Sequence, residues 1–215
     1  MAAELLIDTV VVALNAAATL PALLRNLPQR QLRSIVVVDR GSDDDTAQIA
    51  RDFGALVLRE PRGGVGAAYA RAQRHFAQLP NTPDIVAMLP ASCAQAATGL
   101  AALWQPLVSR GVELALAIPP GRHEKQSFSH WMLRKAIDTV YRERLAGIYP
   151  VRAIRFAAWV ALGMSDRSET YEIELVVRAM RLGLTYEEVA IAGVEQTSAA
   201  SPRALLHMLR HATIR

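Results

Sequence analysis

The sequence predicts a single α/β domain with a mostly parallel central sheet flanked by helices. Two observations predict it: short runs rich in Val, Ile and Leu alternate with stretches of helical spacing, and the connections between them are short. Such alternation builds right-handed βαβ units and therefore a parallel sheet. The length of 215 residues and the hydrophobic content of 52% suit one core of ordinary size.

The first part of the chain shows this alternation clearly. Leu6–Ala13 is an apolar run with one polar interruption, which is typical of a buried strand. Ala17–Leu27 carries leucines at helical spacing along one face. Ser34–Asp39 is β-branched throughout its middle, as in strands buried on both faces. A helix at 44–53, ended by Gly54, and a strand at 55–59 follow.

The later segments continue the alternation and then depart from it. A loop rich in Pro and Gly, Glu60–Gly66, leads into a helix. Past Gly147 the alternation ends, since Val151–Leu162 mixes both patterns. In chain order we predict a helix at 67–78, a strand at 84–89, a helix at 96–109, a strand at 113–118, helices at 128–145 and 172–182, a strand at 185–191 and a helix at 202–211.

Composition excludes several classes of protein. No apolar run approaches the roughly 18 residues of a membrane-spanning helix. The single cysteine, Cys93, rules out an intramolecular disulfide and a cysteine-based zinc site. The net charge of +4 is spread along the chain, which argues against a nucleic-acid partner. Residues 1–20 lack the basic start of a signal peptide, so we expect a cytoplasmic protein.

A ligand of an open α/β sheet lies beyond the carboxyl ends of its strands. The strongest candidate there is Asp39, whose carboxylate closes a Val-rich strand and can accept hydrogen bonds from a base N–H or a ribose hydroxyl. Gly41 then permits a tight turn. One of the acidic residues at 43–45 is expected to cap the next helix. The other segments of this edge are 14–16, 59–64, 90–92 and 119–122.

A glycine-rich loop precedes the helix at 67–78. Its glycines Gly63, Gly64 and Gly66 suit an anion site at a helix start. The dinucleotide-binding pattern is incomplete, because Tyr69 stands where the third glycine is required and no acidic residue follows about twenty positions later. This difference argues against a nicotinamide-dependent enzyme.

Three stretches resemble glycosyltransferase family 2: Val36–Thr46 (Val-Val-Val-Asp-Arg-Gly-Ser-Asp-Asp-Asp-Thr), Arg59–Ala68 and Val151–Arg155. With further matching segments the resemblance covers nearly the whole chain, and it is closest to the bacterial branch similar to dolichyl-phosphate mannosyltransferases. It implies a GT-A fold, which is Rossmann-like, and sugar transfer from a UDP- or GDP-linked donor. It also implies a nucleotide-sugar-binding half at 1–118 and an acceptor-side half at 119–215.

The resemblance assigns roles to individual residues. Asp39 would contact the base of the donor, with Asn15 in the same pocket, and the loop Gly63–Gly66 would border the donor. Glu174 would lie on the acceptor side, where it could act as a base. An ion pair between Glu174 and Arg178, four residues later on the same helix, is an equal alternative.

The chain departs from the family pattern at charged positions around the diphosphate. Ala16 and Gly147 stand where the family has Glu and Asp, and Pro90-Ala91-Ser92 replaces the metal-binding Asp-x-Asp. Hard divalent cations prefer carboxylate oxygens, and Ser92 offers only a neutral hydroxyl. We therefore expect no divalent metal cofactor.

Cationic side chains are the expected substitutes for a metal at the diphosphate: Arg62 on the glycine loop, Arg122 and Lys125. Two functions remain open, a metal-independent glycosyltransferase or a catalytically degenerate homologue that binds a nucleotide or a partner. The basic, amphipathic segment Arg203–Arg215 suits an anionic membrane and a polyprenyl-phosphate acceptor. Packing on the domain or on a second subunit of a homodimer is the alternative for this segment.

Overall fold

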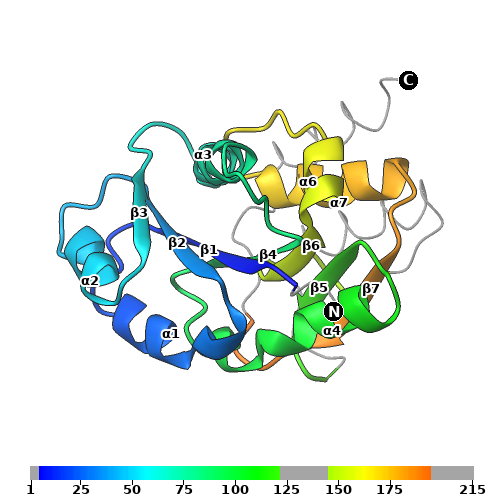
Figure 1. The fold of residues 1–215 in the computed structure, drawn as a ribbon, viewed down its shortest axis with the longest axis horizontal. Coiled ribbons are helices and arrows are strands. Elements are labelled where there is room, and N and C mark those ends of the chain that lie inside the picture. The colour runs from blue at the N-terminus through cyan, green and yellow to red at the C-terminus, as the bar shows by residue number, and fades with distance from the viewer. Residues whose placement is uncertain (1–4, 122–144, 195–215) are drawn as a thin grey trace.

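The computed structural model describes residues 5–121 and 145–194. These residues form one seven-stranded sheet with the strand order β3-β2-β1-β4-β6-β5-β7 (Figure 1). The predicted α/β domain with a mostly parallel sheet is thereby confirmed. The strands are β1 (Ile7–Ala13), β2 (Ser34–Asp39), β3 (Leu56–Arg59), β4 (Ile85–Pro90), β5 (Leu114–Ile118), β6 (Arg152–Arg155) and β7 (Tyr186–Ala190).

The register of the strands defines one edge of the sheet that matters for function. β1 runs parallel to β2 and β4, and it aligns Ala13 with Asp39 and Val12 with Pro90. The ends of these three strands therefore meet at one edge, which we call the carboxyl edge. β6 is antiparallel to β4 and β5 and aligns Arg152 with Met88, so β6 begins near the carboxyl edge.

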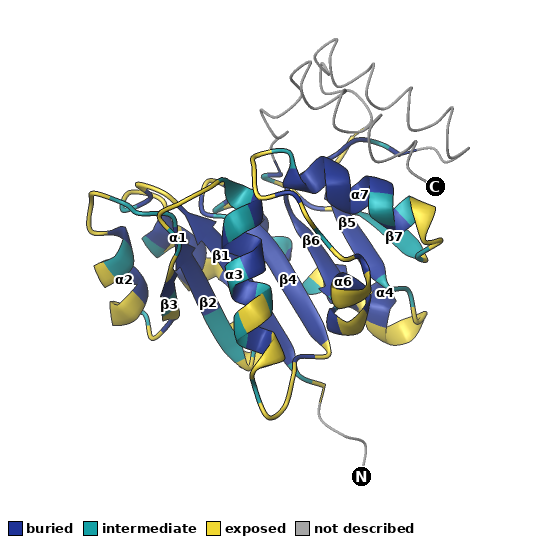
Figure 2. Ribbon diagram, turned by 90° about the horizontal axis from the view of Figure 1, so that it is seen from above, coloured by how far each residue is buried: buried dark blue, intermediate teal, exposed yellow. Residues whose placement is uncertain are grey.

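Helices cover both faces of the sheet (Figures 1 and 2). One face packs against α3, α6 and α7, with Val10 and Val12 of β1 in its core. The other face packs against α1, α4 and a short 3₁₀ turn, with Val11 of β1 in its core. The helices are α1 (Leu20–Asn26), α2 (Thr46–Asp52), α3 (Val65–Ala77), α4 (Ala101–Ser109), α6 (Phe156–Ala161) and α7 (Tyr171–Arg181), with 3₁₀ turns η1 (Gln29–Gln31) and η2 (Ala96–Gly99).

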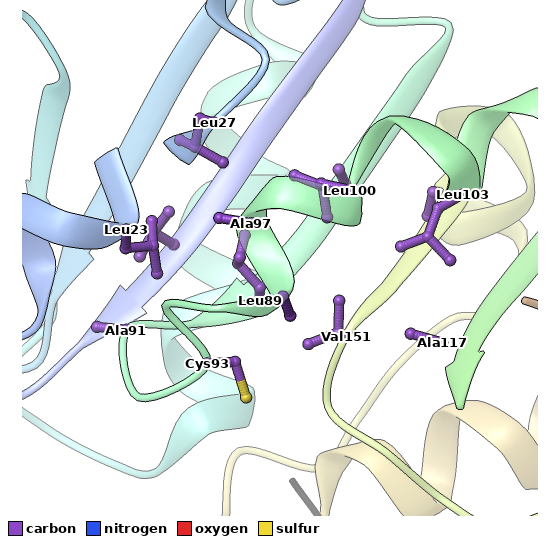
Figure 3. Packing of buried hydrophobic residues seen from close by; sticks show 14 of the residues in the cluster. Leu23, Leu27, Leu89, Ala91, Cys93, Ala97, Leu100, Leu103, Ala117 and Val151 are labelled. Carbon is purple, nitrogen blue, oxygen red and sulfur yellow. The ribbon is translucent and has the colours of Figure 1, made fainter. Parts of the chain in front are cut away.

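The core on the α1 and α4 face reaches the end of β4. Leu89 and Ala91 pack there beside Leu23 and Ala97, and Cys93 is buried next to them (Figure 3). Small side chains allow η2 to approach the sheet closely. A Cβ added to Gly99 would lie 2.8 Å from Cγ2 of Ile191, so a larger residue here would force that side chain to shift.

Most element bounds agree with the sequence prediction to within a few residues. The helix predicted at 96–109 is divided into η2 and α4. The mixed segment 151–162 contains β6 followed directly by α6. The predicted helix at 202–211 and all but the last residue of the one at 128–145 lie outside the described residues. Among the described helices, none is both long and apolar enough to span a bilayer.

Candidate functional site

Asp39 is the buried acid of the carboxyl edge. It is the last residue of β2 and is 2% exposed. Its Oδ1 accepts hydrogen bonds from the backbone N–H of Ser42 at 2.9 Å and from the Ser42 hydroxyl at 2.6 Å. Both bonds hold the carboxylate through one oxygen and fix the turn that follows β2.

Asn15 connects the end of β1 to this turn. Its backbone is left-handed, with φ of 47°, a conformation that Asn tolerates better than most residues. Its N–H donates to the Ser42 hydroxyl at 2.9 Å, and its Oδ1 accepts from the N–H of Asp43 at 3.0 Å. The structure thus brings Asn15 and Asp39 together around Ser42.

A second set of hydrogen bonds joins the same two loops below Asn15. The hydroxyl of Thr46 accepts from the N–H of Ala16 at 2.7 Å and donates to Asp44. Asp44 also accepts from the N–H of Ala17 at 3.0 Å. The hydrogen bond from the Thr46 hydroxyl and the one from the Ala17 N–H lower the pKa of Asp44.

Asp44, just before α2, belongs to the same hydrogen-bond network. Asp45 is the N-cap position, but its side chain makes no capping hydrogen bond. Asp44, one residue earlier, instead accepts from the N–H of Thr46 at 3.0 Å. Ala16, where the resemblance led us to expect a Glu, is buried in the core beneath these loops.

The glycine loop is a packing surface for another part of the chain. The N–H groups of Gly64 and Gly66 donate to the carbonyls of Arg167 at 2.8 Å and Ser168 at 3.0 Å. A Cβ on Gly66 would lie 2.3 Å from the carbonyl oxygen of Asp166. These amides at the start of α3 are therefore bound within the protein, and the glycines are required because two backbones meet here.

Gly41 and Gly63 have left-handed backbones, with φ of 90° and 91°. A Cβ on Gly41 would lie 3.0 Å from Cβ of Pro61, so the turn after β2 packs against the start of the glycine loop. Arg62 is exposed on this loop. The loops after β2 and β3 thus form one continuous rim beside Asp39.

Residues 166–169, which we call the rim segment, complete this edge. Arg40, directly after Asp39, forms an ion pair with Glu169. Within the segment, Asp166 accepts hydrogen bonds from Ser168 N–H at 2.7 Å and from the Thr170 hydroxyl at 2.5 Å. The rim segment therefore joins the turn after β2 to the start of α7.

Glu174 is buried in α7 and is 1% exposed. Its carboxylate accepts from the Ser165 hydroxyl at 2.7 Å, the Asp166 N–H at 2.7 Å and Nε of Arg178 at 2.7 Å. Burial alone would raise the pKa of Glu174, but the hydrogen bonds and the charge of Arg178 together lower it. Of the two alternatives in the sequence analysis, the ion pair with Arg178 is present.

Arg152 and Glu172 form a buried ion pair that the sequence analysis did not select. Nη2 of Arg152 lies 3.9 Å from Oε1 of Glu172, and both side chains are buried. Burial raises the pKa of Glu172, and the nearby charge of Arg152 acts in the opposite direction. The available signal was an arginine between apolar residues of a strand. In a strand that is buried on both faces, every side chain points into a core.

The end of β4 offers little to a metal ion. Pro90 and Ala91 carry no donor atom in their side chains, and the hydroxyl of Ser92 is exposed. In the described part of the chain, no group of three or more His, Cys, Asp or Glu residues could hold an ion. The described residues therefore include no cluster that would hold a cation by protein side chains alone. Arg122 and Lys125 lie outside the described residues.

A cavity of about 650 Å³ lies elsewhere, at the connection between α7 and β7. Its lining runs from Met180 through Gly183 to Glu188. β7 runs parallel to β5, so this cavity borders the amino end of the sheet, opposite the carboxyl edge. None of Asn15, Asp39 or Ser92 lines it.

Sequence comparison places the chain among glycosyltransferases. The family model "Glycosyl transferase family 2" matches residues 8–78, which include Asn15, Asp39 and the glycine loop. Two curated relatives are described as uncharacterized glycosyltransferases, one from Mycobacterium tuberculosis strain H37Rv and one from Mycobacterium bovis. Each is 33% identical to this chain and aligns over 91% of it and 88% of the relative.

Solved structures of glucosyl-3-phosphoglycerate synthase from Mycobacterium tuberculosis share the fold. One, in complex with Mn²⁺, UDP and glucosyl-3-phosphoglycerate, has a TM-score of 0.79 and 21% identity over 99% of this chain and 82% of that chain. Another, with Mg²⁺ and UDP, has a TM-score of 0.78 and 21% identity over 99% of this chain and 81% of that chain.

These structures correct the expectation that no divalent metal is involved. Glucosyl-3-phosphoglycerate synthase, which shares this fold, holds Mn²⁺ or Mg²⁺ together with UDP, so the sequence argument for a metal-free site is wrong. Its weakness was to infer the cofactor from three residues, Pro90-Ala91-Ser92, while a cation near a diphosphate also draws oxygen ligands from elsewhere.

The similarity to the curated relatives and the similarity of fold to the solved structures point to the same family. The curated relatives align over 91% of the chain, and the structural match extends over 99% of it. The chain belongs to glycosyltransferase family 2 and has the GT-A fold.

Proposed function

We propose that the protein transfers a sugar from a nucleoside diphosphate sugar to an acceptor. The observation that carries this proposal is the buried carboxylate of Asp39 at the carboxyl edge, held through one oxygen by Ser42. Its second oxygen accepts no hydrogen bond from the described residues, and it is the proposed acceptor for a base N–H. The family membership supports a nucleotide-sugar donor.

The donor is proposed to lie across residues 1–118, with its base at Asn15 and Asp39. Its diphosphate would extend along the rim toward Arg62, Gly63 and Gly64, with Ser92 and the cations Arg122 and Lys125 as further candidates. A divalent cation, when bound, would neutralise charge on the departing diphosphate. Because the described residues include no cluster of three or more ligating side chains, transfer assays compare Mn²⁺, Mg²⁺ and EDTA.

The acceptor is proposed to bind on the side of residues 119–215 and to carry a phosphate. Two acceptors follow from the relationships: a polyprenyl phosphate, as in dolichyl-phosphate mannosyltransferases, and phosphoglyceric acid, which the solved neighbour binds. The first would suit a cytoplasmic enzyme that touches a membrane through Arg203–Arg215. Assays with both acceptors, and vesicle binding of the full chain, separate these proposals.

Nucleotide binding gives the direct test, by titration calorimetry with UDP and GDP in the presence of Mn²⁺. We expect one nucleotide to bind, and Asp39→Asn to weaken it about tenfold or more, the loss of a hydrogen bond to a charged group at about 1.5–3 kcal/mol. Asp52→Asn, an exposed acid of α2, is the matched control and should bind like the parent. If neither nucleotide binds, or if Asp39→Asn binds unchanged, the proposal is wrong.

A second candidate is a homologue that binds the nucleotide without transferring the sugar. The observation that favours it is the absence of carboxylates at Pro90, Ala91 and Ser92. The two candidates differ in a transfer or donor-hydrolysis assay with UDP- and GDP-sugars. Turnover supports the transferase, whereas nucleotide binding without turnover, across both phosphorylated acceptors, supports the binding protein.

A further inference from the structure

Arg152 and Glu172 are two buried charged groups with incomplete hydrogen bonding. Arg152 is 0% exposed, and its Nη2 donates to the carbonyl of Tyr149 at 3.2 Å. Its Nε and Nη1 have no hydrogen-bond partner among the described residues, 5–121 and 145–194. Glu172 is 3% exposed, and its distance of 3.9 Å from Arg152 is an ion-pair distance but too long for a hydrogen bond.

Such an arrangement is costly unless something completes it. A buried donor without a partner loses its hydration and gains nothing in return, and the loss is larger for a charged group. Asp8 and Arg33, another ion pair with a fully buried acid, show the usual solution, because Arg33 donates to both carboxylate oxygens of Asp8. The Arg152–Glu172 pair lacks these direct bonds.

The pair lies close to the proposed donor site. Glu172 is in the first turn of α7, directly after the rim segment that accepts hydrogen bonds from the glycine loop. Tyr171 stacks on Tyr69 of α3 at a ring distance of 5.0 Å. Arg152 is aligned with Met88, two residues before Pro90 at the carboxyl edge. The pair therefore joins the start of β6 to the first turn of α7, near the carboxyl edge.

The chemistry of the two groups selects their ligand. The free N–H groups of Arg152 require an acceptor, and the carboxylate of Glu172 requires a donor. A cation alone would leave Arg152 unsatisfied, and an anion alone would be repelled by Glu172. A hydroxyl both donates and accepts, and it needs about the space of one water molecule.

We propose that Arg152 and Glu172 form a subsite for the sugar of the donor, each binding a sugar hydroxyl. This inference rests on the proposed function, because it requires a nucleotide sugar at the carboxyl edge. In this proposal Asp39 and its neighbours bind the nucleotide, and the Arg152–Glu172 pair binds the sugar. The pair thus determines which sugar is accepted, not which base.

The test compares a nucleotide with its sugar conjugate. Titration calorimetry in Mn²⁺ measures UDP against UDP-glucose, and GDP against GDP-mannose, on the full chain and on Glu172→Gln. Gln keeps the shape of Glu but replaces one acceptor oxygen by a donor. We expect Glu172→Gln to weaken the nucleotide sugar at least tenfold and to leave the free nucleotide within twofold.

A matched control separates this role from general loss of structure. Asp8→Asn removes a buried acid from an ion pair at the opposite end of β1. Asp8→Asn should lower the free energy of unfolding without changing the ratio of the affinity for the nucleotide sugar to the affinity for the free nucleotide. Arg152→Lys is the second variant, and it should lower the same ratio while retaining the positive charge.

The outcomes distinguish the two levels of the proposal. Equal affinities of the parent and Glu172→Gln for the nucleotide sugar overturn the subsite, as does an equal loss for nucleotide and nucleotide sugar. In both cases nucleotide binding survives as evidence for the proposed function. If no nucleotide binds to the parent chain, the proposed function fails, and the subsite fails with it. A structure with only water between Arg152 and a bound nucleotide sugar also overturns the subsite.

Discussion

Glu174 combines deep burial with a carboxylate that remains charged. The three groups nearest to it, from Ser165, Asp166 and Arg178, all donate hydrogen bonds to its oxygens. Hydrogen bonds to a buried carboxylate stabilise its charged form and hold the connection between α6 and α7 in place. The hydrogen bonds of Glu174 therefore indicate that this residue stabilises the fold.

The first prediction concerns this stabilising role. Glu174→Ala should lower the free energy of unfolding by about 3 kcal/mol at pH 7, because it leaves the partner groups in a buried site without their acceptor. Glu187→Ala, which breaks the more exposed pair with Arg110, should cost less than about 1 kcal/mol. Urea unfolding of the three proteins measures the difference.

The same contact has a defined pH dependence. The folded-state pKa of Glu174 is lowered, so its contribution to stability is present above the ordinary value of 4.5 and is lost as the pH falls through the folded-state pKa. The gap in stability between the parent and Glu174→Ala should therefore narrow between pH 5 and pH 3. A gap that is constant over this range contradicts the assigned pKa shift.

Single residues also show what the sequence could and could not predict. Asp39 and Asn15 follow recognisable strands, and strand ends meet at one edge of a parallel sheet, so their proximity was predictable. The contact between Arg152 and Glu172 joins a strand to a helix 20 positions later, and its geometry depends on how α7 packs. The spacing of residues along the chain does not predict how a helix packs on the sheet, so this contact could not be predicted.

At the scale of elements, the glycine loop and the rim segment behave as one unit. Two backbone hydrogen bonds from Gly64 and Gly66 join them, and Arg40 and Glu169 tie them to the turn after β2. The sequence suggested an anion site from the glycines alone. In the structure these glycines permit close contact between backbones, a constraint that arises from a segment about 100 residues away.

The second prediction tests that close contact. Gly66→Ala should lower the free energy of unfolding by about 3 kcal/mol, at the upper end for overpacking, because its Cβ would overlap the carbonyl of Asp166. Gly111→Ala is the control: its φ is 72° and nothing lies within 4 Å, so only backbone strain of about 1 kcal/mol is expected. Thermal and urea unfolding measure both.

The difference between Gly66→Ala and Gly111→Ala in free energy of unfolding tests whether the contact is a constraint. Equal losses for Gly66→Ala and Gly111→Ala would mean that the rim segment moves aside easily, and the contact with the glycine loop would then be no constraint. A larger loss at Gly66 that also weakens nucleotide binding would connect this contact to the donor site. The parent chain with UDP or GDP supplies the reference for the second measurement.

Across the whole molecule, the sheet continues past residue 118, where the resemblance to the family implied a boundary between two halves. β5 ends at that residue and pairs with β6 and β7, which both follow it in the chain. The alternating pattern predicted strands up to β5 well, because each is a compact apolar run. The antiparallel insertion of β6 was not predictable from Val151–Leu162, since a four-residue strand that runs directly into a helix has no clear period.

The continuity of the sheet leads to a prediction about folding. A fragment of residues 1–118 contains β5 but neither of its partners, so β5 has no strand to pair with and one side of β4 is uncovered. Unpaired strands expose backbone groups and apolar side chains that the full domain buries. We expect the fragment to lack a cooperative urea transition and the near-ultraviolet circular dichroism of the full chain. Cooperative unfolding of the fragment would instead make residues 1–118 an independent folding unit, with residues 119–215 added to a structure that is already complete.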